Sequence, residues 1–164
     1  PPPYCLSQPN RKTKYTVSPY AVVRIGQDDF FYAGGNTLGE TYNISVADVY
    51  ARVNHAVMIN GTLDKSYIGR VFAGNEVDTV ITTKSDWDSQ AYGADIRDTV
   101  IENIFFDCID NEDAIAFDFA RNKRDNTIEN VMIRNAFVGN CKTPIRNEQK
   151  GKPTVDGLHG KFVQ

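Results

Sequence analysis

Residues 99–117 read TVIENIFFDCIDNEDAIAF, and the stretch NTIENVMIRN follows at 126–135. Both stretches contain Ile-Glu-Asn followed by an aliphatic residue, at 101–104 and at 128–131, with starts 27 residues apart. Self-similarity at an interval of this length is typical of repeat architectures, in which each repeat is one small structural unit that packs against its neighbours. The recurrence therefore predicts a repeating fold.

Two earlier segments, VADV at 46–49 and IGRV at 68–71, have the same two aliphatic positions. The four copies start at 46, 68, 101 and 128, so the intervals are 22, 33 and 27 residues. After a polar break, each copy is followed by a second short apolar segment, at 56–59, 79–81, 114–117 and 144–145. Short alternating apolar segments indicate β-strands. We expect two or three strands per repeat, each stacked in parallel at about 4.8 Å on the strand of the next repeat.

The third residue of each copy is expected at a corner between strands, and these residues are Asp48, Arg70, Asn103 and Asn130. Asparagine tolerates the left-handed backbone that such corners require. If the copies stack, Asn103 and Asn130 lie above one another. Stacked asparagines can share side-chain hydrogen bonds, so we expect a ladder between these two.

The pattern resembles the right-handed parallel β-helix superfamily, which includes pectate-lyase-like and polygalacturonase-like proteins and the tailspike depolymerases of bacteriophages. The likeness rests on TVIENI at 99–104, NTIENV at 126–131 and NEDAIAF at 111–117, and it covers roughly residues 43–148. It implies an all-β fold of about four coils. The alternative is an antiparallel β-sandwich or jelly roll, because its strands also recur every 8–12 residues or so.

The chain divides by composition into four parts. The first part is rich in Pro, Ser, Asn and Lys and has no apolar periodicity, which is typical of an arm or linker. The second contains two short apolar runs at 20–26 and 30–33, separated by a turn, and predicts a hairpin. The expected parts are an arm at 1–19, a hairpin or entry segment at 20–42, β-helix coils at 43–148 and a C-terminal extension at 149–164.

Charge and hydropathy exclude two classes of partner. The net charge is −3 and the pI is about 5.4, whereas nucleic-acid binding needs a clustered basic surface. The sequence has no apolar run long enough to span a membrane. We therefore expect neither nucleic acid nor a membrane span.

The three cysteines, Cys5, Cys108 and Cys141, are odd in number and irregularly spaced, which argues against a disulfide framework or a four-cysteine zinc site. Cys108 and Cys141 lie in apolar segments and are expected to be buried free thiols. His55 has no second imidazole near it in the sequence and is expected to be a structural histidine. No metal or other cofactor is expected.

The 33-residue interval contains an insertion at 82–93 that holds the only tryptophan of the chain. Insertions in repeat folds emerge as loops on one face and often carry the binding surface. An exposed aromatic ring can cover the apolar face of a sugar while carboxylates accept hydrogen bonds from its hydroxyls. The sugar-binding candidates are Asp86, Trp87, Asp88 and Tyr92. Alternatively, the loop buries its own tryptophan.

The acidic turn at 107–113 is the candidate catalytic site, with Asp110, Glu112 and Asp113 as candidate acids. Glycoside hydrolysis needs one protonated and one ionised carboxyl group, and crowded carboxylates can differ in pKa in this way. The family resemblance places the paired aspartates of polygalacturonases on Glu112 and Asp113, with Glu in place of the first Asp. Asp118 alternates with two phenylalanines and is expected to point outward, as a further groove acid. The alternative is a solvated turn.

These observations favour binding and cleavage of a bacterial surface polysaccharide or another polysaccharide. Hydrolysis is the first expectation for the chemistry and lyase cleavage the second. The alternative function is a non-catalytic structural or adhesive segment of a virion or cell-surface fibre. Either function implies an extracellular or virion-surface location, and the resemblance to tailspikes implies a homotrimer or the continuation of a longer chain.

Overall fold

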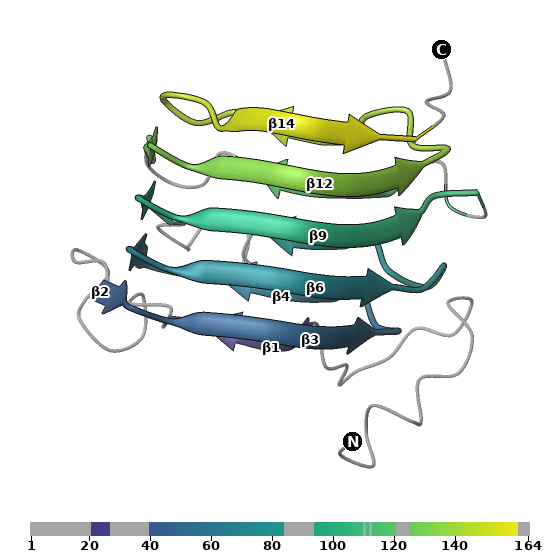
Figure 1. Ribbon diagram of the computed structural model, residues 1–164, viewed down its shortest axis with the longest axis horizontal. Helices are drawn as coiled ribbons and strands as arrows, with labels where there is room; N and C mark the ends of the chain where they lie inside the picture. The colour runs from purple at the N-terminus through teal and green to yellow at the C-terminus, as the bar shows by residue number, and fades with distance from the viewer. Residues whose placement is uncertain are drawn as a thin grey trace.

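The computed structural model describes residues 21–26, 40–83, 94–109, 111, 113–120 and 125–160, and strands are the regular elements of these ranges (Figure 1). The strands form three sheets, which we call sheets A, B and C. Every strand pair in the described ranges is parallel, so the antiparallel sandwich is wrong there. The fold is all-β and consistent with a parallel β-helix.

Each sheet collects strands that are far apart in the sequence. Sheet A contains β1 (Ala21–Ile25), β4 (His55–Ile59), β7 (Thr79–Thr82), β10 (Ile115–Phe119) and β13 (Ile145–Asn147). Sheet B contains β2 (Glu40–Tyr42), β5 (Thr62–Asp64), β8 (Ile96–Arg97) and β11 (Ile128–Glu129). Sheet C contains β3 (Ser45–Ala51), β6 (Tyr67–Ala73), β9 (Val100–Asp107), β12 (Met132–Gly139) and β14 (Thr154–His159). The chain passes through A, B and C in this order, and we call each such passage a circuit.

The start of the chain joins the same sheets. β1 pairs in parallel with β4, and β2 pairs in parallel with β5. The strand expected at 20–26 is therefore present, with a parallel partner from the next circuit. The second strand expected for the hairpin, at 30–33, lies outside the described residues, as does the N-terminal arm.

The register confirms three copies of the repeat and corrects the fourth. Val46, Ile68 and Ile101 are neighbours in sheet C, as predicted. The residue beside Ile101 in the next circuit, however, is Ile133, whereas Ile128 pairs with Ile96 in sheet B. The two Ile-Glu-Asn segments therefore belong to different sheets, and the predicted alignment of 101–104 with 128–131 is wrong.

Two sets of left-handed residues explain this error. Between sheets B and C the chain bends at Asn43, Lys65, Asp98 and Asn130, with φ of 56°, 47°, 46° and 50°. Within the sheet C strands it bends again at Asp48, Arg70, Asn103 and Asn135, with φ of 58°, 50°, 55° and 48°. The predicted ladder between Asn103 and Asn130 is wrong because they occupy different bends. Asn130 instead donates to Asp98 Oδ1 at 2.5 Å.

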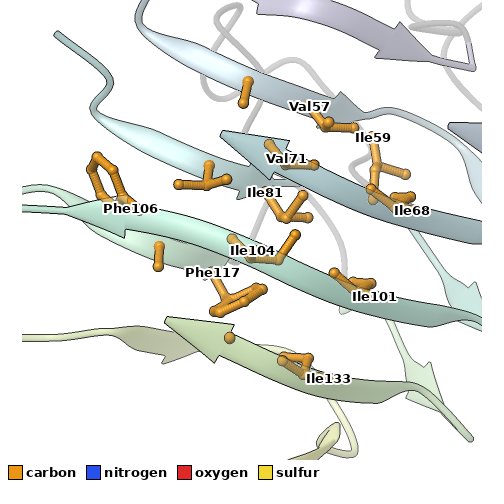
Figure 2. Close-up of a cluster of buried hydrophobic side chains, with 14 of the residues drawn as sticks. Val57, Ile59, Ile68, Val71, Ile81, Ile101, Ile104, Phe106, Phe117 and Ile133 are labelled. Atoms are coloured by element: carbon orange, nitrogen blue, oxygen red, sulfur yellow. The ribbon is translucent and has the colours of Figure 1, made fainter. Parts of the chain in front are cut away.

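The core is a column of aliphatic and aromatic side chains between the sheets (Figure 2). Val57, Ile81 and Phe117 of sheet A point into the same interior as Ile101 and Ile104 of sheet C, and all five are fully buried. β4 and β7 are buried along their whole length, so both faces of sheet A are covered there. This burial on two faces explains why residues 56–59 of β4 read as a continuous apolar run in the sequence.

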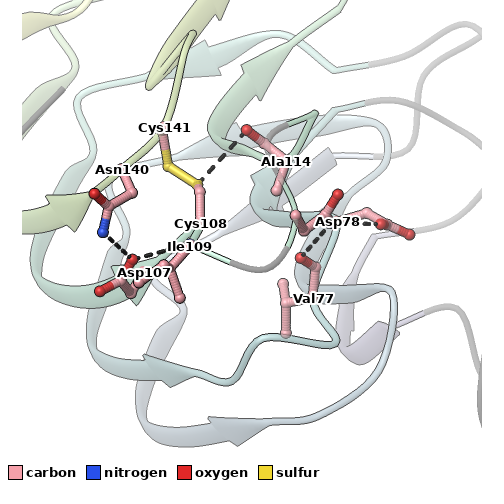
Figure 3. Close-up of a disulfide and its surroundings, with 9 residues drawn as sticks. Val77, Asp78, Asp107, Cys108, Ile109, Ala114, Asn140 and Cys141 are labelled. Atoms are coloured by element: carbon pink, nitrogen blue, oxygen red, sulfur yellow. Dashed lines mark hydrogen bonds between the residues drawn. A yellow bond between two sulfur atoms is a disulfide. The ribbon is translucent and has the colours of Figure 1, made fainter. Parts of the chain in front are cut away.

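Cys108 and Cys141 form a disulfide, so the prediction of two free thiols is wrong (Figure 3). Cys108 follows β9 and Cys141 follows β12, 33 residues later, in the next circuit. Residues at equivalent positions of stacked strands lie about 4.8 Å apart. The observed Cα–Cα distance of 5.0 Å is close to this spacing and within the range that a disulfide bridges.

Candidate functional site

Five aromatic side chains form a continuous stack on the outer face of sheet C. Tyr50, Phe72, Phe105, Phe137 and His159 are in register in five successive strands. The distances between successive ring centroids are 5.1, 4.8, 5.2 and 4.9 Å. We call these five residues the aromatic stack.

The aromatic stack is open to solvent along its length. Tyr50 is 70% exposed, and the three phenylalanines are 36–46% exposed. The first four ring planes lie within 9° of their neighbours, so the rings cover one another's faces and turn their edges outward. A contiguous exposed apolar surface of this kind marks a binding site more often than an isolated exposed residue does.

An open groove of about 490 Å³ runs beside the aromatic stack. Its lining residues are Tyr50, Ala51, Arg52, Phe72, Ala73, Gly74, Phe105, Phe106, Asp107 and Phe137. Arg52, Gly74, Asp107 and Gly139 take equivalent positions, each two residues beyond a ring of the aromatic stack. The two glycines alternate with the two charged residues, and neighbouring side chains pack over them, Glu76 over Gly74 and Asp107 over Gly139.

Ion pairs lie on both sides of the aromatic stack. Arg52 Nη2 donates to Glu76 Oε1 at 2.7 Å, and this hydrogen bond raises the pKa of Arg52. Two residues before the rings, Arg70 donates to both carboxylate oxygens of Asp48, at 2.6 and 2.9 Å. The hydrogen bond from Arg70 lowers the pKa of Asp48 below its ordinary value. In both of these ion pairs the positive and the negative charge are therefore already paired with each other.

The acidic turn predicted as the catalytic site begins at the groove. Asp107 lines the groove, and its Oδ1 accepts hydrogen bonds from Asn140 Nδ2 at 2.7 Å and from the Ile109 amide at 3.0 Å (Figure 3). The disulfide of Cys108 anchors the turn to the next circuit. Asn111 binds the previous circuit through Asp78 Oδ1 at 3.1 Å. The described part of the turn is thus held from both sides.

The structure describes two of the predicted site residues, Asp113 and Asp118, and does not place them in one site. Asp113 is exposed on the acidic turn. Asp118 lies in sheet A, is 1% exposed and is bound by Arg146, so it is not part of the groove on sheet C. The remaining candidates, Asp86, Trp87, Asp88, Tyr92, Asp110 and Glu112, lie outside the described residues and stay predictions.

The aromatic stack was not predicted from the sequence, although the sequence contains a signal for it. Each ring follows the first aliphatic residue of its repeat by four positions, as Tyr50 follows Val46 and Phe105 follows Ile101. With the fourth copy placed at 128 instead of 133, Phe137 falls out of this column and the series is broken. The series of rings becomes apparent only when the fourth copy starts at Ile133.

His55 is confirmed as a structural histidine, because it is buried and its Nδ1 lies 2.5 Å from Thr79 Oγ1. Among the described residues, no three His, Cys, Asp or Glu side chains are grouped as a metal site would require. The same residues include no helix long and apolar enough to cross a membrane.

Comparison with known proteins gives no match: no family model, no curated relative and no solved structure is significantly similar to this chain.

Proposed function

We propose that this chain is part of a right-handed parallel β-helix protein of the pectate-lyase-like kind that binds and cleaves a polysaccharide. The order of strands supports a helix of about four coils. Four circuits contain a strand in each sheet, and a fifth has β13, a bridge from Lys150 to Thr127, and β14. Stacked coils of this kind present a flat outer face on which a long ligand can lie.

The groove beside the aromatic stack carries the proposal. The exposed edges of four rings supply an apolar strip against which a sugar chain can pack, and Arg52 and Asp107 supply hydrogen-bonding groups beside it. Ligand sites in general combine an apolar lining with a few polar groups that fix orientation. A line of rings that continues over several strands suits a polymer better than a small compact ligand.

Cleavage is assigned to the acidic turn that follows Asp107. Glycosidases use two carboxyl groups about 5–9.5 Å apart, one as proton donor and the other as nucleophile or base. We propose that Asp110, Glu112 and Asp113 supply the acids. Asp86, Trp87, Asp88 and Tyr92 of the insertion at 82–93 are proposed to contribute further sugar-binding groups. We propose that Asp118 supports the site indirectly, by stabilising sheet A, because its carboxylate is buried and ion-paired.

The disulfide supports an extracellular or virion-surface location. Disulfides persist in oxidising environments and are rare in the cytosol. Cys108 and Cys141 are both buried, and their bond joins two circuits next to the proposed site. Assembly as a homotrimer, or as a section of a longer chain, remains part of this proposal.

The binding step is tested by native gel electrophoresis in gels that contain a panel of polysaccharides. Tyr50→Ala removes the most exposed ring of the aromatic stack and is expected to lower the affinity at least fivefold. The matched control is Tyr42→Ala, since Tyr42 is 64% exposed but lies in sheet B, away from the groove. If the two variants were retarded equally, the groove would be excluded as the binding site.

The cleavage step is tested by release of reducing ends from the polysaccharides that bind. Asp113→Asn, Glu112→Gln and Asp110→Asn are compared with Asp156→Asn, which changes an exposed aspartate of β14. We expect a loss of at least a hundredfold in one of the first three and none in the control. Full activity in all three would exclude the acidic turn as the catalytic site.

A second candidate function is a non-catalytic structural or adhesive segment of a fibre. It is favoured by the way the site residues are engaged, because the rings stack face to face and Asp107 is held by Asn140 and Ile109. Such contacts strengthen the stacking of circuits whether or not a ligand binds. Retardation by a polysaccharide without release of reducing ends would select an adhesive segment.

A further inference from the structure

The charges around the groove limit which polysaccharide can occupy it. Three arginines lie on or beside the described outer face of sheet C: Arg52, Arg70 and Arg134. Each is paired with a carboxylate, at 2.7 Å with Glu76, 2.6 Å with Asp48 and 2.6 Å with Glu102. Among the described residues, no lysine lines the groove.

None of the described arginines is paired with the acid that lines the groove. Asp107 lines the groove and is held by neutral donors, the Asn140 amide and the Ile109 backbone. Asp156 adds a further exposed carboxylate to the same sheet. The charged residues of the groove lining are thus one arginine that is already paired and one carboxylate that is held by neutral donors. Recognition of an anionic sugar would instead use an arginine that is available for a bidentate contact.

The geometry of the aromatic stack points to an extended chain. Successive rings are 4.8–5.2 Å apart, a repeat set by the spacing of the strands. This repeat is close to the rise of one pyranose residue in an extended β-linked glycan. A glycan that lies across the strands can therefore place one sugar beside each ring. The outward ring edges carry partial positive charge, which suits hydroxyl and acetal oxygens.

We infer that the groove on sheet C takes a neutral, extended β-linked glycan and discriminates against uronate-rich or sulfated chains. This inference rests on the proposed function, and it names the class of substrate for the same groove. A uronate near Asp107 would face a like charge. Two unit charges at 4 Å in water repel strongly enough to change an affinity about fivefold. A uronate chain in the groove should therefore bind about fivefold more weakly than a neutral glycan of the same shape.

The test compares neutral and anionic glycans on the full chain. Hydroxyethyl cellulose, galactomannan, polygalacturonate and alginate are cast in native gels, at low and at high salt. We expect retardation by a neutral polymer that salt does not change, and about fivefold weaker binding of the two uronates at low salt. Binding of a uronate polymer without any neutral one would overturn this inference and leave the proposed function standing. Retardation by none of a broad panel would overturn the proposed function itself.

The length of the bound segment gives a second readout. Four rings line the groove, so the affinity for oligosaccharides of the retained glycan should rise up to about four sugars and then level off. A disaccharide that binds as tightly as a tetrasaccharide would contradict the match of one sugar to one ring.

A charge variant separates electrostatic selection from shape. Asp107→Asn should narrow the preference for neutral over anionic polymers about fivefold. Asp125→Asn is the matched control, because it removes the same charge at an exposed position outside the groove. An unchanged preference in Asp107→Asn, in a variant whose melting temperature shows that it is folded, would mean that Asp107 does not select against anionic chains.

Discussion

Arg146 donates two hydrogen bonds to the carboxylate of Asp118, one from Nε at 2.7 Å and one from Nη2 at 2.5 Å. The two residues are register partners in β10 and β13. Asp118 is 1% exposed, whereas the side chain of Arg146 is 36% exposed. The pair therefore links the last two strands of sheet A through a carboxylate that has left water almost completely.

Arg146→Met is expected to lower the free energy of unfolding by about 3 kcal/mol, because it leaves a buried carboxylate without its partner. Urea denaturation followed by circular dichroism measures this change. The double variant Arg146→Met with Asp118→Leu should recover part of the loss, since no buried charge remains. If the double variant loses as much free energy of unfolding as Arg146→Met and Asp118→Leu lose in sum, the two residues are not coupled.

Removing the disulfide with Cys108→Ser and Cys141→Ser together is expected to cost about 3–4 kcal/mol, from the entropy of a closed loop of this length. The loop spans a sequence separation of 33 residues. Thermal unfolding of the oxidised protein, with and without the two substitutions, gives the difference. Alkylation of the unreduced, denatured protein should label Cys5 alone, and labelling of all three cysteines would contradict the pairing.

The pair of Asp48 and Arg70 predicts a dependence on pH with a defined sign. The hydrogen bond from Arg70 lowers the pKa of Asp48 in the folded chain. A carboxylate whose pKa is lower when folded adds stability above its unfolded pKa of about 3.9, and this stability is lost as the pH falls through the folded pKa. In a carboxyl NMR titration, Arg70→Met should move the Asp48 midpoint upward. High salt should weaken the effect, because both side chains are exposed.

Asn103 is expected to tolerate glycine better than alanine. Its φ is 55°, a left-handed conformation that costs an alanine about 1 kcal/mol or more and costs glycine little strain. We expect Asn103→Ala to lower the midpoint of urea unfolding and Asn103→Gly to lower it less. The same order is expected at Asn135, where φ is 48°. A reversed order at both positions would indicate that side-chain contacts of the asparagine outweigh its backbone conformation.

The strands were predictable because the interior of a narrow stack accepts only apolar side chains at alternate positions. Val46, Ile68 and Ile101 fall in one column of sheet C, and this alignment could be read directly from their spacing. The left-handed backbone at Asp48, Arg70 and Asn103 was predicted as well, but the corner expected there between two strands is wrong, because all three residues lie within strands of sheet C. These features depend on short-range patterns, which any single repeat displays.

The site was less predictable, for two physical reasons. Its rings come from strands that are distant in the sequence, so a shift of five residues in one repeat, from 133 to 128, hides Phe137 from the series. Its polar groups are also decided by contacts between circuits. The sequence could not show that Asn140 binds Asp107 or that Arg146 covers Asp118.

By itself, the sequence determined that this chain is built from repeated short strands, because apolar alternation and polar breaks are local properties. Only the tertiary structure decided which repeats are neighbours. Each circuit has two left-handed bends, and both accept the pattern of an aliphatic residue, two further residues and a second apolar position. Ile-Glu-Asn therefore occurs at both bends, before sheet C at Asn130 and within it at Asn103. Core packing and parallel strand pairing decide which bend each segment occupies. They thereby also determine the positions of the disulfide, the aromatic stack and the groove.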